Sequence, residues 1–483
     1  MEILWGSHQT NLAELLQCFP NEVWEVQESD GGKLYFVWTH LSHRCCPICV
    51  DSRSFVASQD FKQHPLPSQW ERVDRYAKLM HNLNIYEDPT GPNLSPQAWR
   101  ELRTIKSAGL LPNLQSLEWY PDTDAFKYID LFQSPQLTSL KVRIIPDIPD
   151  VLHVLASLSV GTLRELRFLD LSGNRDVQGA ISKLVLRTTT TLRSIEVSSD
   201  LSGAAVHHVT RLPNLNDASI RFVDLHLPAA SPDVTFPSLR TLEMRVDNGG
   251  GWKYLVGEAV NLESLVLHSL TALHWQEVVD VFGSPINKGL YRTIHRFSFA
   301  AFEPCDLTPH MFTPFHNFGS LTRLFVTSPC DPGQCKSQLT NGSLVQLAKA
   351  LPKLVELFLG GVPCGSPARG ITLTGLHPLS MHCVNLETLQ VHFDALDTPT
   401  DVPEDMLSQP PDQLLSNPNH CHLSRLVVGG LPVSTSAKSP LIVAYLLHQM
   451  FPSLSKILRS VEDSPWKKVQ EYVDVFRKYR LKQ

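Results

Sequence analysis

The sequence predicts an α/β fold in which short parallel strands alternate with helices, and three observations carry this prediction. A leucine-type pattern, L-x-x-L-x-L, recurs along most of the chain. A proline stands two residues before the first leucine in several copies, and the stretches between copies have the apolar spacing of helices. A unit of about 20–29 residues that repeats in this way is typical of a solenoid built from stacked strand–helix units.

Each copy of the pattern predicts one short strand. Apolar spacing of three residues and then two fits neither a helix nor a simple alternating strand, but it fits a strand entered through a tight bend. The mean step between copies is about 29 residues, and single steps range from 23 to 37. The copies are Met80/Leu83/Ile85, Leu114/Leu117/Trp119, Leu137/Leu140/Val142, Leu166/Leu169/Leu171, Leu192/Ile195/Val197, Leu215/Ala218/Ile220, Leu239/Leu242/Met244, Leu262/Leu265/Leu267, Ile294/Phe297/Phe299, Leu321/Leu324/Val326, Leu354/Leu357/Leu359, Leu386/Leu389/Val391, Leu423/Leu426/Val428 and the incomplete Leu454/Ile457.

The prolines mark where each helix ends and the next strand begins. Proline cannot continue a helix, because it has no N–H and its ring clashes with the preceding turn. The residue before a proline also favours an extended conformation. The prolines that share this position are Pro112, Pro135, Pro213, Pro237, Pro352 and Pro452.

Between the strands the apolar spacing becomes helical. Val151, Val154, Leu155 and Leu158 follow the i, i+3, i+4, i+7 pattern, with Asp150 as the expected N-cap. Leu344, Leu347, Ala348 and Leu351 repeat it, where Ser343 and Gln346 predict a capping box, as do Val443, Leu446, Leu447 and Met450. The predicted fold is therefore a leucine-rich-repeat solenoid, a horseshoe with parallel strands on the concave face and helices outside.

Composition limits the functional classes. The formal net charge of −6 over 483 residues argues against a nucleic-acid binder, which usually carries a basic face. The ten cysteines form no regular disulfide framework, which favours a reducing compartment. No signal peptide and no apolar run near membrane-spanning length is visible, so we expect a cytoplasmic or nuclear protein that does not enter a membrane.

No motif in the sequence predicts catalysis, a metal or a cofactor. His43, Cys46 and Cys49 supply half of a zinc site, but the second pair of ligands is missing, so a reduced surface loop is the preferred interpretation. Glycines at 249–251 are not followed by the Gly-Lys-Ser/Thr of a phosphate loop. No catalytic serine, histidine or carboxylate arrangement is recognisable, and we expect a protein that is not an enzyme.

The concave face is the expected binding surface, because residues that flank the second and third leucines point outward from each strand. Aromatic and arginine side chains carry much of the energy of protein interfaces. The candidate partner-binding residues are His268, Arg296, Arg323, Phe325, Phe358 and His392. The alternative is that C-terminal helices, or the loop from Asp394 to His420, cover Phe325 and Phe358.

Several stretches of the sequence resemble the F-box/leucine-rich-repeat family of mushroom-forming fungi. A Trp…Leu-Leu-x-Cys-hydrophobic-Pro segment is matched by Trp5, Leu15, Leu16, Cys18, Phe19 and Pro20, and a second segment by "LPSQWERVDRYAKLM" at 66–80. The stretch "MHCVNLETLQVHFDA" at 381–395 and the closing features Gly429, Phe451/Pro452 and Trp466/Val469 also fit. One feature departs from the family, because the F-box would lie before Leu4, where the chain leaves no room for it.

The resemblance implies a substrate-recruiting subunit of a cullin-RING (SCF-type) ubiquitin ligase. Its concave face would hold a protein substrate, and it would bind the ligase adaptor only if an F-box exists upstream. The alternative is a stand-alone repeat scaffold that binds a protein without ubiquitin chemistry. The expected organisation is a helical segment at 1–36, an irregular insertion at 37–65, the solenoid at 66–450 and a C-terminal cap at 451–483.

Overall fold

The computed structural model consists of two compact units, Met1–Leu215 and Asn216–Gln483. Each unit is described by itself. The residues that the structure describes are 24–27, 58–61, 67–86, 93–94, 96–106, 109–120, 124–146, 148, 150–222, 236–246, 261–269, 275–283, 289–302, 307–329, 337–360, 370–395, 421–429, 439–459 and 465–480.

The first unit has a parallel sheet in which strand order follows chain order. The strands of this sheet are β3 (Asn82–Tyr86), β5 (Ser116–Tyr120), β6 (Ser139–Ile144), β7 (Glu165–Asp170) and β8 (Ser194–Asp200). The helices of the unit are α3 (Pro67–Ala77), α4 (Pro96–Ile105), the 3-10 helix η1 (Asp124–Phe132), α5 (Val151–Ser157), α6 (Arg175–Val185) and α7 (Gly203–Thr210). Strand and helix therefore alternate, as the sequence pattern predicts.

The second unit repeats this arrangement. Its parallel strands are β9 (Asp217–Phe222), β10 (Thr241–Val246), β11 (Ser264–Ser269), β12 (Arg296–Ala301), β13 (Arg323–Thr327), β14 (Glu356–Leu359), β15 (Thr388–Val391), β16 (Arg425–Gly429) and β17 (Lys456–Arg459). Its helices are α9 (Trp275–Gly283), α10 (Leu290–Thr293), η3 (Pro309–Asn317), α11 (Asn341–Ala350), η4 (Thr374–Leu376), α12 (His377–His382), α15 (Ser439–Met450) and α16 (Trp466–Arg480).

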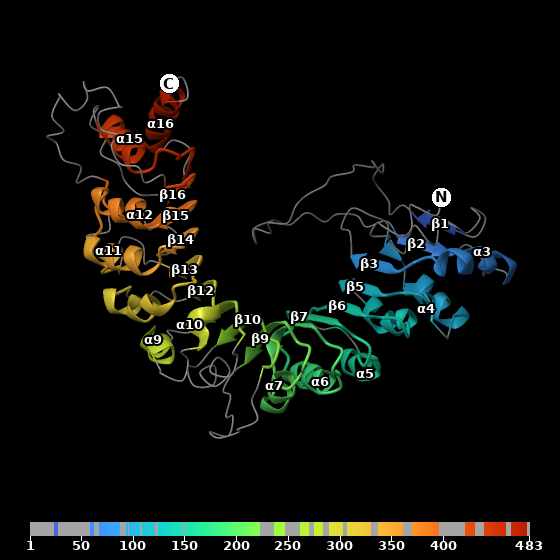
Figure 1. Cartoon of the computed structure of the whole chain (residues 1–483). Coiled ribbons are helices and arrows are strands. Elements are labelled where there is room, and N and C mark those ends of the chain that lie inside the picture. Colours follow the sequence, from blue (N-terminus) through green and yellow to red (C-terminus); the bar gives the residue numbers. More distant parts are fainter. Residues whose placement is uncertain are drawn as a thin grey trace. The chain divides into compact units, whose positions relative to one another are not determined.

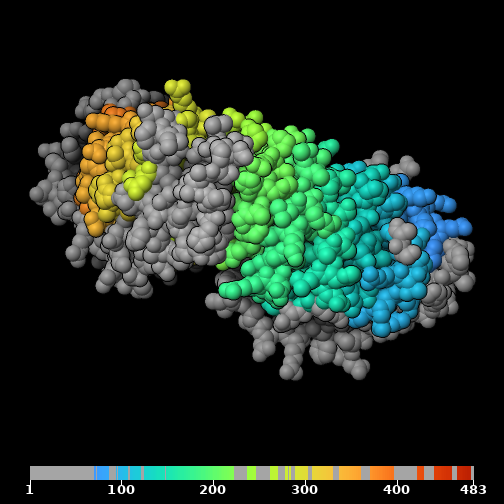
Figure 2. Space-filling view, turned by 90° about the horizontal axis from the view of Figure 1, so that it is seen from below, coloured from blue at the N-terminus to red at the C-terminus, as the bar shows by residue number. Residues whose placement is uncertain are grey.

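In each unit the helices lie along one face of the sheet and leave the other face without helices (Figure 1). Seen from the helix side, the elements of the first unit follow one another in chain order from blue to green (Figure 2). Both units thus have the architecture of a leucine-rich-repeat solenoid, in which each strand pairs with the strand of the next repeat and helices form the second layer.

The pattern leucines form the core because they lie at the same register position in every strand. Leu117 pairs with Leu140, and Leu140 with Leu166; in the second unit Leu324 pairs with Leu357, and Leu357 with Leu389. All of these side chains are at most 1 % exposed. Burial of one such side chain contributes about 1.5–3 kcal/mol, so a stack of them stabilises the whole layer.

One of the predicted copies is wrong by three residues. The structure places Leu163, Leu166 and Phe168 in the core, whereas Leu169 is half-exposed and Leu171 is 56 % exposed. The stretch has leucines in both registers, and pairing decides between them: Leu166 lies opposite Leu140 and Phe168 opposite Val142. A phenylalanine in the third position concealed the correct register from a pattern that counts leucines.

The prolines occupy β-turns rather than simple helix ends. The Leu114 N–H donates to the Leu111 carbonyl, the Leu137 N–H to the Ser134 carbonyl, and the Leu354 N–H to the Leu351 carbonyl. Each proline is therefore the second residue of a four-residue turn, where its fixed φ is favourable.

A second backbone device fixes the register at the start of each strand. One carbonyl accepts hydrogen bonds from two successive N–H groups of the next repeat, as the His81 carbonyl does from Gln115 and Ser116. The carbonyls that do this belong to His81, Gln115, Thr138, Arg164, Asn216, Arg240, Glu263, His295, Thr322, Val355, Glu387 and Ser424. Because the same contact recurs across steps of different length, strand entry does not depend on the length of the intervening segment.

One predicted helix start is confirmed and another is corrected by the structure. Asp150 is the N-cap of α5, which begins at Val151, but it has a φ of 59° and its side chain forms no capping hydrogen bond. The capping box of α11 joins Thr340 and Ser343, not Ser343 and Gln346, because the helix begins at Asn341 and Thr340 is its N-cap. The error at α11 comes from choosing the cap by residue type without knowing where the helical turn begins.

Short strands also occur near the start of the chain. β1 (Trp24–Gln27) pairs antiparallel with β2 (Ser58–Phe61), and β2 pairs with β4 (Asn93–Leu94). β1 falls within the predicted helical segment 1–36, β2 within the predicted insertion 37–65, and β4 within the predicted solenoid. Most of residues 1–65 lie outside the described residues. The predicted cap, 451–483, contains a further repeat strand, β17, followed by α16. Among the described helices, none combines the length and apolarity required to cross a membrane.

Candidate functional site

The helix-free face of each sheet, here called the open face, presents one outward side chain at every second strand position. In β5, for example, Leu117 and Trp119 point into the core, whereas Ser116, Glu118 and Tyr120 are half-buried on the other side. Parallel pairing places equivalent outward positions side by side, so the open face consists of rows of side chains that run across the strands.

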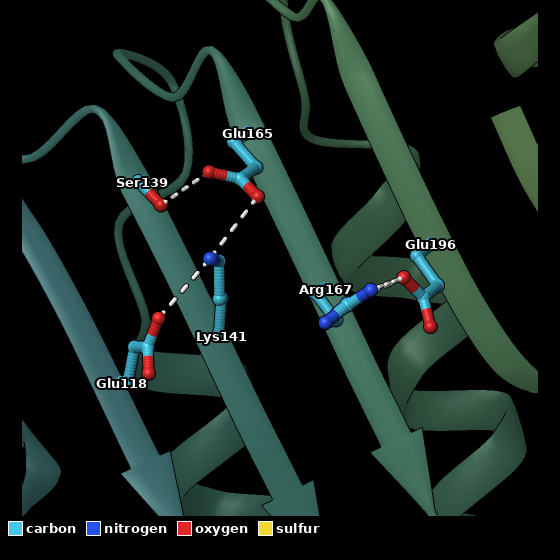
Figure 3. Close-up of polar contacts among 6 residues, drawn as sticks. All are labelled: Glu118, Ser139, Lys141, Glu165, Arg167 and Glu196. Carbon is cyan, nitrogen blue, oxygen red and sulfur yellow. Dashed lines mark hydrogen bonds and ion pairs between the residues drawn. The ribbon is translucent and has the colours of Figure 1, made fainter. Parts of the chain in front are cut away.

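In the first unit the central row is charged and internally paired (Figure 3). The Lys141 Nζ lies 3.1 Å from the Glu118 Oε1 and 3.5 Å from the Glu165 Oε1. Arg167 on β7 pairs with Glu196 on β8, and the Ser139 hydroxyl donates to Glu165 at 2.8 Å. Each cation is thus paired with a carboxylate on an adjacent strand, which is the stabilising arrangement for cross-strand pairs.

This network shifts the pKa values of the groups within it. Burial alone would lower the pKa of Lys141, but its hydrogen bond to Glu118 and the charge of Glu165 raise it above the usual lysine value. Burial and the neighbouring Glu118 charge also raise the pKa of Tyr120. The lysine therefore stays charged and engaged, and the row offers few unpaired charges to a partner.

In the second unit the equivalent row contains a pair of aromatic side chains on neighbouring strands. The rings of Phe325 on β13 and Phe358 on β14 are stacked with centroids 4.5 Å apart and planes inclined by 17°. The Arg296 guanidinium lies 5.7 Å from the Phe325 centroid. Both phenylalanines are half-buried and Arg296 is exposed. A stacked pair with a cation over one ring is a preformed, partly desolvated surface of the kind found at interface hot spots.

The other predicted residues of this surface are arranged in two places. The Arg323 Nε lies 3.8 Å from the Glu356 Oε1, a long contact that leaves 48 % of the arginine side chain exposed. His268 lies two strands from Phe325 and contacts Glu243, with Nε2 3.4 Å from Oε1. The hydrogen bond from His268 holds the pKa of Glu243 below its usual value. Two predicted residues, Arg296 and Arg323, thus lie beside the aromatic pair, and His268 belongs to a separate polar cluster.

His392 does not lie on the open face. It is 3 % exposed and follows directly after Val391, the last residue of β15. The His392 ring packs against Gly360, where a Cβ would lie 3.5 Å from the ring and where φ is +97°. Counting one residue beyond the third pattern position, Val391, therefore overextended this strand by one residue, and His392 is part of the packing.

The sequence prediction missed the charged row of the first unit. Glu118, Lys141, Arg167 and Glu196 occupy the same position in four successive strands, so a run of charged residues at the second outward position was a visible pattern. It was overlooked because only the C-terminal strands were considered as a surface.

The described residues provide neither a cluster of metal ligands nor a reactive thiol. They contain no group of three or more His, Cys, Asp or Glu residues arranged for a metal. His43, Cys46 and Cys49 lie outside the described residues. The two described cysteines are buried, and burial raises the pKa of Cys383 to about 12 and that of Cys421 to about 11. The Cys383 Sγ lies 3.5 Å from the Leu351 carbonyl oxygen, so it acts as a weak donor in the core.

Comparisons with known proteins identify no family for this chain. No protein-family model matches it, and no curated protein matches it. Among solved structures it is similar to a leucine-rich-repeat protein of Leptospira interrogans, at 11 % identity and a TM-score of 0.31. That similarity covers 83 % of this chain and 90 % of the other.

Proposed function

We propose that this protein is a binding scaffold that holds a protein partner on the open face of its second unit. The observation that carries the proposal is the stacked Phe325–Phe358 pair with Arg296 against it. Aromatic and arginine side chains in partly desolvated surroundings are the groups that dominate interface energy. The described residues lack a metal cluster, and their two buried thiols have raised pKa values, so binding is better supported than catalysis.

A more specific role rests on the sequence resemblance to F-box/leucine-rich-repeat proteins. We propose that the partner is a substrate for ubiquitination and that the chain serves as the substrate-recruiting part of a cullin-RING ligase, in the cytoplasm or nucleus. The transfer of ubiquitin would occur on other subunits, so this role requires no catalytic residue here. The alternative is a repeat scaffold without ubiquitin chemistry, which would bind the same surface but no ligase adaptor.

The first experiment tests the surface. We expect the double variant Phe325→Ala/Phe358→Ala to keep the fold and to lose at least about tenfold in partner affinity, because truncation of hot-spot residues costs 2 kcal/mol or more. Quantitative affinity capture from extracts of the native cells, with wild type and variant side by side, measures this loss. The matched control is Phe302→Ala, since Phe302 is 62 % exposed and lies beyond the end of β12.

Two outcomes would contradict the proposal. If the double variant unfolds, the phenylalanines are core residues. If it folds and captures the same partners as wild type, the open face is not the binding surface. A separate pull-down of the ligase adaptor, with the chain and with an upstream-extended form, distinguishes the ubiquitin-ligase role from the stand-alone scaffold.

A further inference from the structure

The open face of the second unit also carries a row of cations beside its aromatic row. From β12 to β17, hydrogen-bonded register aligns the first residues of successive strands in the order Arg296, Arg323, Glu356, Thr388, Arg425 and Lys456. This set, here called the basic row, contains four cations and one carboxylate. Thr388 in its middle is buried, whereas Arg296, Arg323, Arg425 and Lys456 are exposed.

These cations are poorly neutralised within the described part of the chain. Arg425 and Lys456 form no ion pair with a described residue, and Arg296 has only its ring contact with Phe325. Arg323 has the long contact with Glu356. Four cations and one carboxylate give the basic row a net charge of +3 that no described residue outside the row neutralises by an ion pair, on a protein whose formal net charge is −6.

The row beside it is mainly apolar. The next outward position of each strand is occupied, in the same order, by Ser298, Phe325, Phe358, Gln390, Val427 and Leu458. Two residues along a strand span about 6.6 Å, so cations and apolar side chains lie within reach of one extended segment laid across the strands.

We propose that the partner contributes an acidic, extended protein segment in which carboxylates flank a large apolar side chain. This inference rests on the proposed function and specifies its ligand. Carboxylates would lie on the basic row, since Arg and Lys form charge-assisted hydrogen bonds with them, and the apolar side chain would pack on Phe325 and Phe358. The acidic segment complements the face in charge and in polarity.

The geometry also sets the spacing of the acidic residues. Arg323 on β13 and Arg425 on β16 are three strands apart, which is about 14 Å at the usual strand spacing. An extended chain advances about 3.3 Å per residue, so carboxylates about four residues apart reach both arginines. The apolar side chain lies between them in the segment.

A random dodecapeptide library displayed on phage tests the inference with the full chain as bait. We expect selected peptides to carry Asp or Glu about four positions apart around a Phe, Trp or Leu. A synthetic, fluorescein-labelled copy of the selected sequence then serves as the probe in anisotropy titrations. We expect Arg425→Glu/Lys456→Glu to weaken its binding about tenfold or more, and added salt to weaken wild-type binding.

The matched control is Lys467→Glu/Lys468→Glu, which changes the net charge equally on two exposed residues in the first turn of α16. It should change the affinity less than about twofold, because these lysines lie outside the basic row. Urea midpoints of all variants check that each is folded.

Failures of the inference and of the proposed function are distinguishable. The acidic segment is overturned if the selected peptides lack acidic enrichment, or if they bind the Arg425→Glu/Lys456→Glu variant as tightly as wild type. In either case the proposed function still stands if the peptides fail to bind Phe325→Ala/Phe358→Ala. If no peptide is enriched, or if binding survives Phe325→Ala/Phe358→Ala, the open face is not the binding surface and both fail.

Discussion

The open faces of the two units use the same strand position in opposite ways. In the first unit the charged residues of the central row form ion pairs with nearby side chains of the same face. Lys141 contacts the carboxylates of Glu118 and Glu165, and Arg167 pairs with Glu196. In the second unit the equivalent row holds the stacked Phe325 and Phe358. Beside it lie cations of which only Arg323 has a carboxylate partner among the described residues, Glu356 at 3.8 Å. The same repeat register therefore supports one open face whose charges are internally paired and another that presents apolar and positive groups to a partner.

The largest expected effect separates the two sides of a single strand in the second unit. Leu357→Ala should lower the free energy of unfolding by about 2–5 kcal/mol, because it leaves a cavity behind a fully buried residue. Phe358→Ala, one residue further on and facing outward, should cost about 1 kcal/mol through loss of its stacking partner. Urea denaturation followed by circular dichroism compares them. Equal losses would mean that the aromatic row is core, and the contrast between the two faces would fail.

An intermediate effect is expected in the charged row of the first unit. Lys141→Met should destabilise by about 1 kcal/mol, because the lysine side chain is 22 % exposed and its ammonium contacts two carboxylates. The matched control is Arg240→Met, whose pair with Glu263 is largely exposed and should contribute less than about 0.5 kcal/mol. If Lys141→Met instead leaves stability unchanged and weakens partner binding, the first unit also has an interaction face.

The smallest expected effect is on the pH dependence of stability through Glu243. The depressed pKa of Glu243 means that its ionised form stabilises the fold above the usual glutamate value of 4.5, and that this contribution is lost as pH falls through the lower, folded-state pKa. Wild type should therefore exceed Glu243→Gln in urea midpoint near pH 6, and the difference should vanish at the acid end of the range. A difference that is constant with pH would show that ionisation of Glu243 does not contribute.

Much of the fold was predictable because the same buried apolar positions recur in every repeat. Thirteen of the fourteen pattern copies, such as Leu354/Leu357/Leu359, coincide with strands in which those residues are inward, and the turn prolines mark the entry points. Leu166, Leu169 and Leu171 failed because two leucine registers overlap there, and hydrogen-bonded pairing to β6 decides between them. A pattern of residue types does not contain that pairing.

The candidate surface was predictable only in part. Phe325, Phe358 and Arg296 follow from simple alternation along β12 to β14, so their proximity could be expected from the repeat register. His392 failed because the end of a strand depends on where the chain turns, and here Asp394 bonds back to Ile371 immediately after β15. Which charges neutralise one another also depends on side-chain geometry, which residue order alone does not fix.

The shared carbonyl at each strand entry has a consequence for how such a surface can change over time. Because that contact recurs unaltered while the outer segments differ in length, insertions on the helix side need not alter the distance between neighbouring outward side chains. Outward side chains on neighbouring strands of the open face then keep a constant spacing of about 4.8 Å. New binding specificity can arise by substitution of single outward side chains, without a change in the positions of the others.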